Sequence, residues 1–133
     1  MQRQSELSAE DHRKIREIAD ATNRRNRLAR EKRTAEIATR REAAWAEVHR
    51  LLHRFHEIDS GVDRLIVFGS LARDDMKRPD FDIDIAVRSE RYLELLGPAL
   101  ESRFKVDLVD LLGASSYITA AISREGIEIH HGE

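Results

Sequence analysis

Residues 64–87 read RLIVFGSLARDDMKRPDFDIDIAV, and this stretch decides the fold. Its apolar start, Arg64–Phe68, predicts a buried strand, and Gly69-Ser70 predicts a turn into a short helix over residues 70–73. Residues 81–87 then alternate between apolar side chains and acidic or small ones, which predicts a second strand with one apolar face. A strand, a glycine turn, a helix and a second strand indicate an α/β fold.

The acidic face of the second strand carries Asp82 and Asp84. Because strand side chains two residues apart point the same way, the two carboxylates lie side by side, and burying them is costly unless a cation lies between them. Oxygen ligands without His or Cys suit Mg²⁺, which also binds nucleotide phosphates. Asp107, in a strand predicted over residues 105–109, could add a third carboxylate. Three such groups can hold two metal ions for a phosphoryl-type displacement.

The junction at Gly69 and Ser70 is a second candidate element. Glycine lets the backbone approach a ligand closely, and the amides that start a helix face outward toward an anion. Gly-Ser pairs are common in turns, so the junction alone indicates only a general phosphate cradle. Arg73, Lys77 and Arg78 could contact a triphosphate, and solvated loop charges are an equally good interpretation.

The remainder of residues 62–133 predicts further helices and strands in alternation. Serines mark helix starts, and glycine or proline marks interruptions and ends. The predicted elements are a helix over 89–96 capped by Ser89, an interruption at Gly97-Pro98, a further turn or two over 98–103, a helix from Ser115 or Ser116 to about Glu125, and an edge strand over 127–130.

Residues 1–60 predict a long helical arm. No proline occurs in residues 1–78 and no glycine between Ser8 and Asp59, so nothing in the backbone obliges a helix to stop there. Ser8, followed by two acids, predicts the helix start, because its hydroxyl can accept hydrogen bonds from free amides. The sequence Asp59-Ser60-Gly61 predicts the helix end.

The two parts of this arm differ in apolar content. From Trp45 onward, apolar residues recur at three- and four-residue steps, so we expect residues 44–58 to pack on a domain over residues 61–133. Residues 8–43 contain only four large apolar side chains and would bury little surface alone. They form a hairpin bent near Thr22-Asn23, a partner-binding arm or a dimer-forming helix, and we expect a homo- or hetero-oligomer.

Length and composition exclude several classes of protein. The 133 residues hold one domain plus an appendage, too few for a multi-domain polymerase. The absence of cysteine excludes a disulfide framework, a thiolate zinc site and a cysteine nucleophile. The longest apolar run has four residues and the start lacks the apolar segment of a signal peptide, so we expect a cytoplasmic protein that does not bind a membrane.

The net charge of −2 hides an asymmetry along the chain. Residues 1–60 carry 14 basic and 11 acidic side chains, and residues 61–133 carry 9 and 14. The stretch over residues 21–41 has eight basic side chains against Glu31 and Glu36, and it could neutralise RNA phosphates. Its acids stand at helical spacing from basic residues, which favours a solvated or partner-facing helix over one that binds nucleic acid.

Gly69-Ser70, followed by Asp82-Ile-Asp84 and later by Asp107, resembles the minimal nucleotidyltransferase (MNT) family of the DNA polymerase β superfamily. The resemblance covers about residues 62–130. It includes the segments LIVFGSLAR (65–73), VDLVDL (106–111) and REGIEI (124–129).

This resemblance implies a small mixed β-sheet flanked by helices, the nucleotidyltransferase fold, with the long arm as an addition. It also implies Mg²⁺-dependent transfer of a nucleoside monophosphate from a nucleoside triphosphate, with two metal ions. In the family the Gly-Ser pair holds the triphosphate, the paired aspartates bind metal and a third acid completes the site. These roles fall on Gly69, Ser70, Asp82, Asp84 and Asp107, and we group Arg73 with the nucleotide-binding residues.

Two features depart from the family pattern. The loop between Gly-Ser and the first aspartate has eleven residues, Leu71 to Phe81, one more than usual, and Asp74 stands where the family commonly has glycine. A longer loop can bulge without moving either strand, so the change affects how the loop approaches a nucleotide.

Stand-alone MNT proteins are antitoxins to HEPN-type ribonucleases, and the resemblance therefore implies a protein adenylyltransferase. We expect the chain to transfer AMP from ATP to a hydroxyl of a HEPN-type toxin (AMPylation). The catalytic part is short, so the acceptor must bring its own binding surface. The alternatives are a non-catalytic antitoxin or adaptor that neutralises its partner by binding through the arm, and an RNA-binding helix carried on a degenerate enzyme domain.

Overall fold

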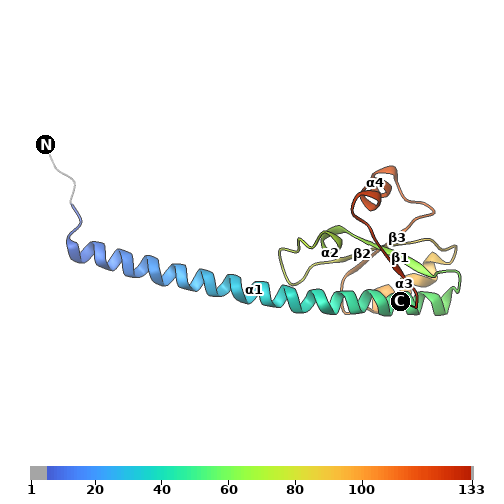
Figure 1. The fold of residues 1–133 in the computed structure, drawn as a ribbon, viewed down its shortest axis with the longest axis horizontal. Helices are drawn as coiled ribbons and strands as arrows, with labels where there is room; N and C mark the ends of the chain where they lie inside the picture. Colours follow the sequence, from blue (N-terminus) through green and yellow to red (C-terminus); the bar gives the residue numbers. More distant parts are fainter. Residues whose placement is uncertain (1–5, 133) are drawn as a thin grey trace. The chain divides into compact units, whose positions relative to one another are not determined.

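The structure is a computed structural model that describes residues 6–132. Residues 1–5, where the expected arm begins, and Glu133 lie outside the described residues. The elements follow one another (Figure 1) as α1 (Ala9–Ile58), β1 (Arg64–Phe68), α2 (Gly69–Arg73), β2 (Ile83–Val87), α3 (Tyr92–Glu101), β3 (Val106–Asp110), α4 (Ser116–Glu125) and β4 (Ile127–His130). Across residues 6–132, none of the helices has the apolar stretch that crossing a membrane requires.

The chain forms two compact units, residues 1–35 and residues 36–133, and the division falls within α1. At the start of α1, Ser8 Oγ accepts a hydrogen bond from the Asp11 amide (3.0 Å), and the Ser8 amide donates to the Asp11 carboxylate (3.1 Å). This reciprocal cap confirms the predicted start. The helix ends at Ile58 as predicted and has no break near Thr22-Asn23, so the hairpin alternative is wrong.

The four strands form one mixed sheet in the order β3-β2-β1-β4, which confirms the predicted fold class. β1 is antiparallel to both β2 and β4, whereas β2 and β3 are parallel. In this register Phe68 is opposite Asp84, and Asp84 is opposite Asp107. The pairing therefore brings the end of β1 and the acids of two other strands into one row across the sheet.

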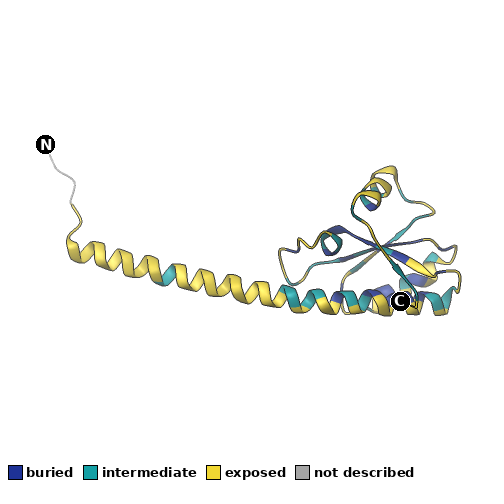
Figure 2. Ribbon diagram, in the orientation of Figure 1, coloured by how far each residue is buried: buried dark blue, intermediate teal, exposed yellow. Residues whose placement is uncertain are grey.

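The two faces of the sheet have different partners. One face packs on the C-terminal part of α1 and on α3, and it contains most of the buried core (Figure 2). The opposite face carries a smaller cluster of Phe68, Ala86 and Ile122, where α4 lies. Because side chains alternate along β2, Asp84 shares this second face with Ala86. The buried part of α1 consists of Ala44, Val48, Leu51, Leu52 and Phe55.

The region over residues 88–103 differs from the prediction. α3 runs through Gly97-Pro98 without interruption, although proline removes one amide donor from the helix. Leu95, Pro98 and Ala99 are buried on one face of α3, and this packing outweighs the lost hydrogen bond. Ser89 does not cap the helix as predicted, because its hydroxyl donates to Asp59 Oδ2 (2.7 Å) and accepts from the Arg91 amide (2.9 Å).

The remaining predicted elements are present with small shifts. The second strand begins at Ile83 instead of residue 81, and the third covers Val106–Asp110. Ser115 caps α4 by accepting from the Ile118 amide (3.3 Å). α4 ends before Gly126, where a Cβ atom would lie 2.4 Å from the Ile122 carbonyl oxygen and 2.7 Å from Ile66 Cγ2. Glycine is required there by close approach to its neighbours.

Candidate active site

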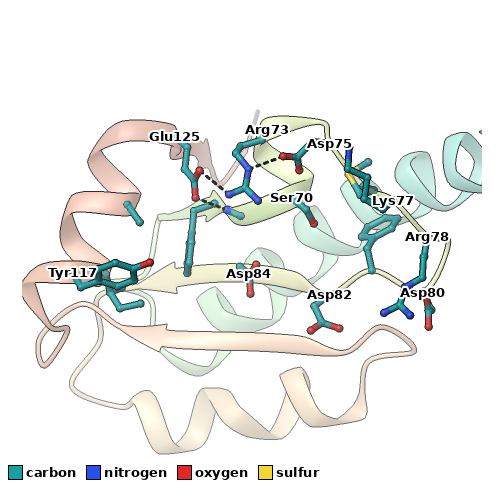
Figure 3. A pocket seen from close by; sticks show the side chains of 16 residues that line it. Ser70, Arg73, Asp75, Lys77, Arg78, Asp80, Asp82, Asp84, Tyr117 and Glu125 are labelled. Atoms are coloured by element: carbon teal, nitrogen blue, oxygen red, sulfur yellow. Dashed lines mark hydrogen bonds and ion pairs between the residues drawn. The ribbon is translucent and has the colours of Figure 1, made fainter.

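A cleft of about 600 Å³ opens where β1 turns into α2, between the start of β2 and α4 (Figure 3). Five of the six residues predicted for the site line it: Gly69, Ser70, Arg73, Asp82 and Asp84. The sixth, Asp107, is not among the lining residues, but it is the strand partner of Asp84. The sheet register has thus assembled residues that are far apart in sequence.

Gly69, the first residue of α2, lies directly against the carboxylate of Asp84. Its φ of +73° lies in the left-handed region, which favours glycine. A Cβ atom at this position would lie 2.1 Å from Asp84 Oδ2, far inside van der Waals contact. The absence of a side chain at residue 69 is therefore what allows the turn and the carboxylate to share one end of the cleft.

The carboxylates repel one another at this end of the sheet. Burial, followed by the neighbouring Asp107 and Asp82 carboxylates, raises the pKa of Asp84 to about 6, against an opposing effect of Arg73. A cation beside Asp84 would relieve this repulsion. The donor set consists of carboxylate oxygens without nitrogen or sulfur, and it therefore fits Mg²⁺.

Asp82 forms an ion pair at the surface. Its carboxylate lies 3.6 Å from Lys105 Nζ, and both side chains are partly exposed. Such a surface ion pair contributes at most about 1 kcal/mol, so Asp82 can turn from Lys105 toward a cation at little cost. Among residues 6–132, no three acidic or histidine side chains already converge on one point.

Arg73 is held in place by two acids that the sequence analysis missed. Its guanidinium lies 2.8 Å from Glu125 Oε2 and 2.9 Å from Asp75 Oδ2, and both pairings raise its pKa further above its usual range (Figure 3). Glu125 also accepts a hydrogen bond from the Gly69 amide (3.1 Å). The last residue of α4 therefore holds the first residue of α2 in place. The only signal of these contacts in the sequence is that Glu125 belongs to REGIEI (124–129), one of the segments that resemble the MNT family.

Asp74 adopts the left-handed conformation that favours glycine. It ends α2 with φ +58°, which is uncommon for any residue but glycine, although aspartate tolerates it better than most. Its amide donates to the Leu71 carbonyl (3.3 Å), and the Asp75 amide donates to the Ser70 carbonyl (3.1 Å). Asp74 and Asp75 therefore form a hydrogen-bonded backbone turn that leads into the loop.

The two ends of the cleft differ in chemistry (Figure 3). The loop that follows Asp74 lines one side and contributes two cations, Lys77 and Arg78. On α4, the cleft is lined by Tyr117, Ile118 and Ala121, and Tyr117 is 79% exposed although it is a large aromatic residue. One space thus combines carboxylates, a glycine turn, cations and an aromatic surface. This combination can hold a metal-bound polyphosphate whose organic end is apolar.

Comparison with known proteins identifies a family whose model matches this chain. Residues 48–123, more than half of the chain, match the family described as "Nucleotidyltransferase domain". The matched range includes every residue predicted for the site. No curated protein matches the chain.

Two solved structures that are similar to this chain are toxin–antitoxin complexes. One is a crystal structure of a toxin–antitoxin with AMP-PNP, with 28% identity and a TM-score of 0.43 over 53% of this chain and 62% of that chain. Another is a mutant of the toxin–antitoxin MntA-HpeT, with 26% identity, a TM-score of 0.43 and the same coverage. This chain therefore spans less than two thirds of the length of these relatives.

Proposed function

Because the chain belongs to the nucleotidyltransferase domain family, we propose that its cleft transfers AMP from ATP to a hydroxyl group of a partner protein. The observation that carries this proposal is the contact between the turn and the acids. Because residue 69 has no side chain, the Asp84 carboxylate lies directly against the turn, and Asp84 is paired with Asp107 in the sheet. In this proposal the amides of the turn bind phosphate and the neighbouring carboxylates bind metal.

In this proposal Asp82, Asp84 and Asp107 would hold two Mg²⁺ ions. When bound, the metal supplies positive charge that stabilises the attacking and leaving oxygens of the displacement. The amides at the start of α2, with the hydroxyl of Ser70, hold the outer phosphates of ATP. Arg73 is kept beside the turn by Glu125 and Asp75, and it would exchange one of these carboxylates for a phosphate oxygen when the triphosphate binds.

The reaction is a single displacement at the α-phosphorus. The acceptor hydroxyl oxygen forms a bond to the α-phosphorus, and the bond from that phosphorus to the oxygen bridging to the β-phosphate breaks. Pyrophosphate leaves with the electron pair of the broken bond. Asp107 accepts the hydroxyl proton, since it adjoins Asp84 on the neighbouring strand.

The aromatic end of the cleft is the natural position for the nucleobase. If the phosphates lie at Gly69 and Ser70, the base reaches the exposed ring of Tyr117, on which it can stack. We expect Tyr117→Ala to weaken ATP binding by about tenfold, because base stacking contributes roughly 1–3 kcal/mol. Tyr117→Phe should bind as wild type. Inorganic tripolyphosphate serves as the control ligand in calorimetry, and an equal loss for both ligands would contradict a base contact.

We propose a HEPN-type ribonuclease toxin as the acceptor, because the motifs of this chain resemble those of the MNT family, and we expect the reaction to take place in the cytoplasm. The cleft is open, and the catalytic part offers little surface for a separate acceptor pocket, so the toxin has to bring its hydroxyl on a surface of its own. The test is to identify the product of the neighbouring gene and, if it is such a toxin, to incubate it with the chain, ATP and Mg²⁺. The toxin should gain the mass of one AMP residue and lose its toxicity. An unchanged toxin mass with full neutralisation would establish the non-catalytic adaptor instead.

Residues 6–35 provide the observation that favours partner binding by the arm. Ile15, Ile18 and Leu28 are each at least half exposed there, and so few apolar side chains cannot stabilise a helix without a covering surface. We expect deletion of residues 1–35 to leave the second unit folded but to lower the mass of the assembly, alone or with the toxin. Light scattering measures this mass. A strictly monomeric full-length chain that also binds no toxin would contradict the expectation.

A further inference from the structure

We propose that Arg40 and Arg41 of α1 are positioning residues of the cleft, because they hold the loop over residues 74–82 that forms one of its walls. The proposal deepens the proposed function, on which it rests for the identity of the nucleotide. No residue of α1 lines the cleft itself. The proposal therefore adds two residues of α1 that support the nucleotide site from outside the cleft. Both arginines and the loop belong to the second unit.

Arg41 fixes the beginning of the loop. Its Nη1 donates to Asp74 Oδ1 at 3.0 Å, and both side chains are partly exposed. Asp74 is the left-handed residue that ends α2, and the next amide, of Asp75, donates back to the Ser70 carbonyl. The arginine therefore acts on the residue whose unusual backbone conformation sets the direction in which the chain leaves the phosphate-binding turn.

Arg40 fixes the end of the loop through two contacts. Its Nε donates to the Pro79 carbonyl at 3.4 Å, and its guanidinium carbon lies 4.1 Å from the centre of the Phe104 ring. The Phe104 ring in turn packs against Phe81 at 6.4 Å between ring centres. Phe81 lines the cleft and directly precedes Asp82. Loss of Arg40 would thus loosen both the loop backbone and the support of a proposed metal ligand.

Between these two points the loop has one buried anchor, Met76, which is 9% exposed and belongs to the main core. The residues after it, Lys77 and Arg78, line the cleft (Figure 3). Anchored at the beginning, middle and end, the longer loop keeps these cations at the edge of the cleft, where Arg78 is exposed and lies 3.5 Å from Asp80. With these anchors, the eleven-residue loop can still form one wall of the proposed nucleotide site.

Each arginine contact is weak alone, so we expect a clear loss of ATP affinity only when both arginines are removed. An exposed ion pair and a cation–π contact each contribute little more than a few-fold, so we expect the double variant Arg40→Ala/Arg41→Ala to bind ATP with Mg²⁺ about tenfold more weakly. Arg41→Lys should retain most of the affinity, because lysine can still pair with Asp74. Arg54→Ala is the matched control, since Arg54 lies on the same helix but pairs with Glu57 (3.8 Å).

The experiment combines two measurements on the full chain. Hydrogen–deuterium exchange without nucleotide reports on the peptide covering residues 74–82, and calorimetry reports on the affinity for ATP with Mg²⁺. The double variant should exchange faster in this peptide and bind more weakly, with a melting temperature close to that of the control. A merely structural role would lower the melting temperature without a selective change in this peptide.

Two results would overturn the proposal. Unchanged exchange in the double variant would show that the arginines do not hold the loop, and faster exchange with unchanged ATP affinity would show that holding the loop does not position the site. If the wild-type chain binds no ATP, the proposed function fails. The exchange data still decide in that case whether Arg40 and Arg41 hold the loop.

Discussion

Asp84→Asn is expected to reduce the affinity for ATP in the presence of Mg²⁺ by about 100-fold or more, because a neutral amide is a poor ligand for a hard cation. Asp82→Asn should weaken binding in the same way. Without Mg²⁺, the two variants and the wild type should bind ATP similarly weakly. Calorimetric titration with and without Mg²⁺ measures both effects.

The same substitution should have the opposite effect on stability. Burial and neighbouring carboxylates raise the pKa of Asp84 to about 6, above the usual aspartate value, so its charged form is disfavoured in the folded state at neutral pH. An amide removes that penalty, and Asp84→Asn should therefore melt at or above the wild-type temperature while binding fails. The penalty in the wild type should decrease as the pH falls below about 6, where Asp84 takes up a proton in the folded state, and should be lost below about 3.8, where the unfolded chain is protonated as well.

Asp110→Asn provides the control for these variants. Asp110 also lies on a strand of the sheet, but its carboxylate accepts from the Leu112 amide (3.0 Å) and is not in the cleft. Its substitution should leave ATP affinity unchanged. Equal Mg²⁺-dependent affinity in the wild type, Asp82→Asn and Asp84→Asn would remove the basis for the proposed metal site.

Gly69→Ala is expected to abolish nucleotidyl transfer with a single added methyl group. Alanine in the left-handed conformation costs roughly 1–2 kcal/mol, and its Cβ would lie 2.1 Å from Asp84 Oδ2. The carboxylate or the turn must move to avoid this contact. Either displacement separates the phosphate-binding amides from the proposed metal ligand, so both ATP affinity and transfer should fall by at least about 100-fold.

Gly97→Ala is the matched control for the added methyl group. Gly97 lies within α3, and a Cβ there would meet nothing within 4 Å. Because alanine is favoured over glycine in a helix by about 0.8–1.0 kcal/mol, this variant should melt at a slightly higher temperature and remain fully active. A fully active Gly69→Ala would show that the close approach to Asp84 has no part in the site.

Local patterns in the sequence predicted the elements that build this site. The alternation of apolar and acidic residues in FDIDIAV places Asp82 and Asp84 on one face, and this pattern depends on neighbouring residues alone. The strand before Gly69 and the helix start at Ser8 are likewise defined by local chemistry. These predictions agree with the structure because each element is consistent with its own periodicity and caps.

The features that the sequence did not predict depend on tertiary contacts. α3 continues through Pro98 because its buried face packs on the sheet, which a local rule about proline cannot include. Glu125 reaches Gly69 across 56 positions of sequence, and Arg40 reaches Pro79 across 39. Such contacts become visible only when the register of the sheet and the path of α1 are known.

The most direct test of the central claim follows which phosphate of ATP reaches the partner. The chain, its proposed toxin partner and Mg²⁺ are incubated with ATP labelled either at the α-phosphate or at the γ-phosphate, and the released product is analysed. Transfer of AMP predicts that the toxin retains only the α-label, with one pyrophosphate released for each label bound. Retention of the γ-label, or no label on the toxin while the complex forms and neutralises it, would contradict the account.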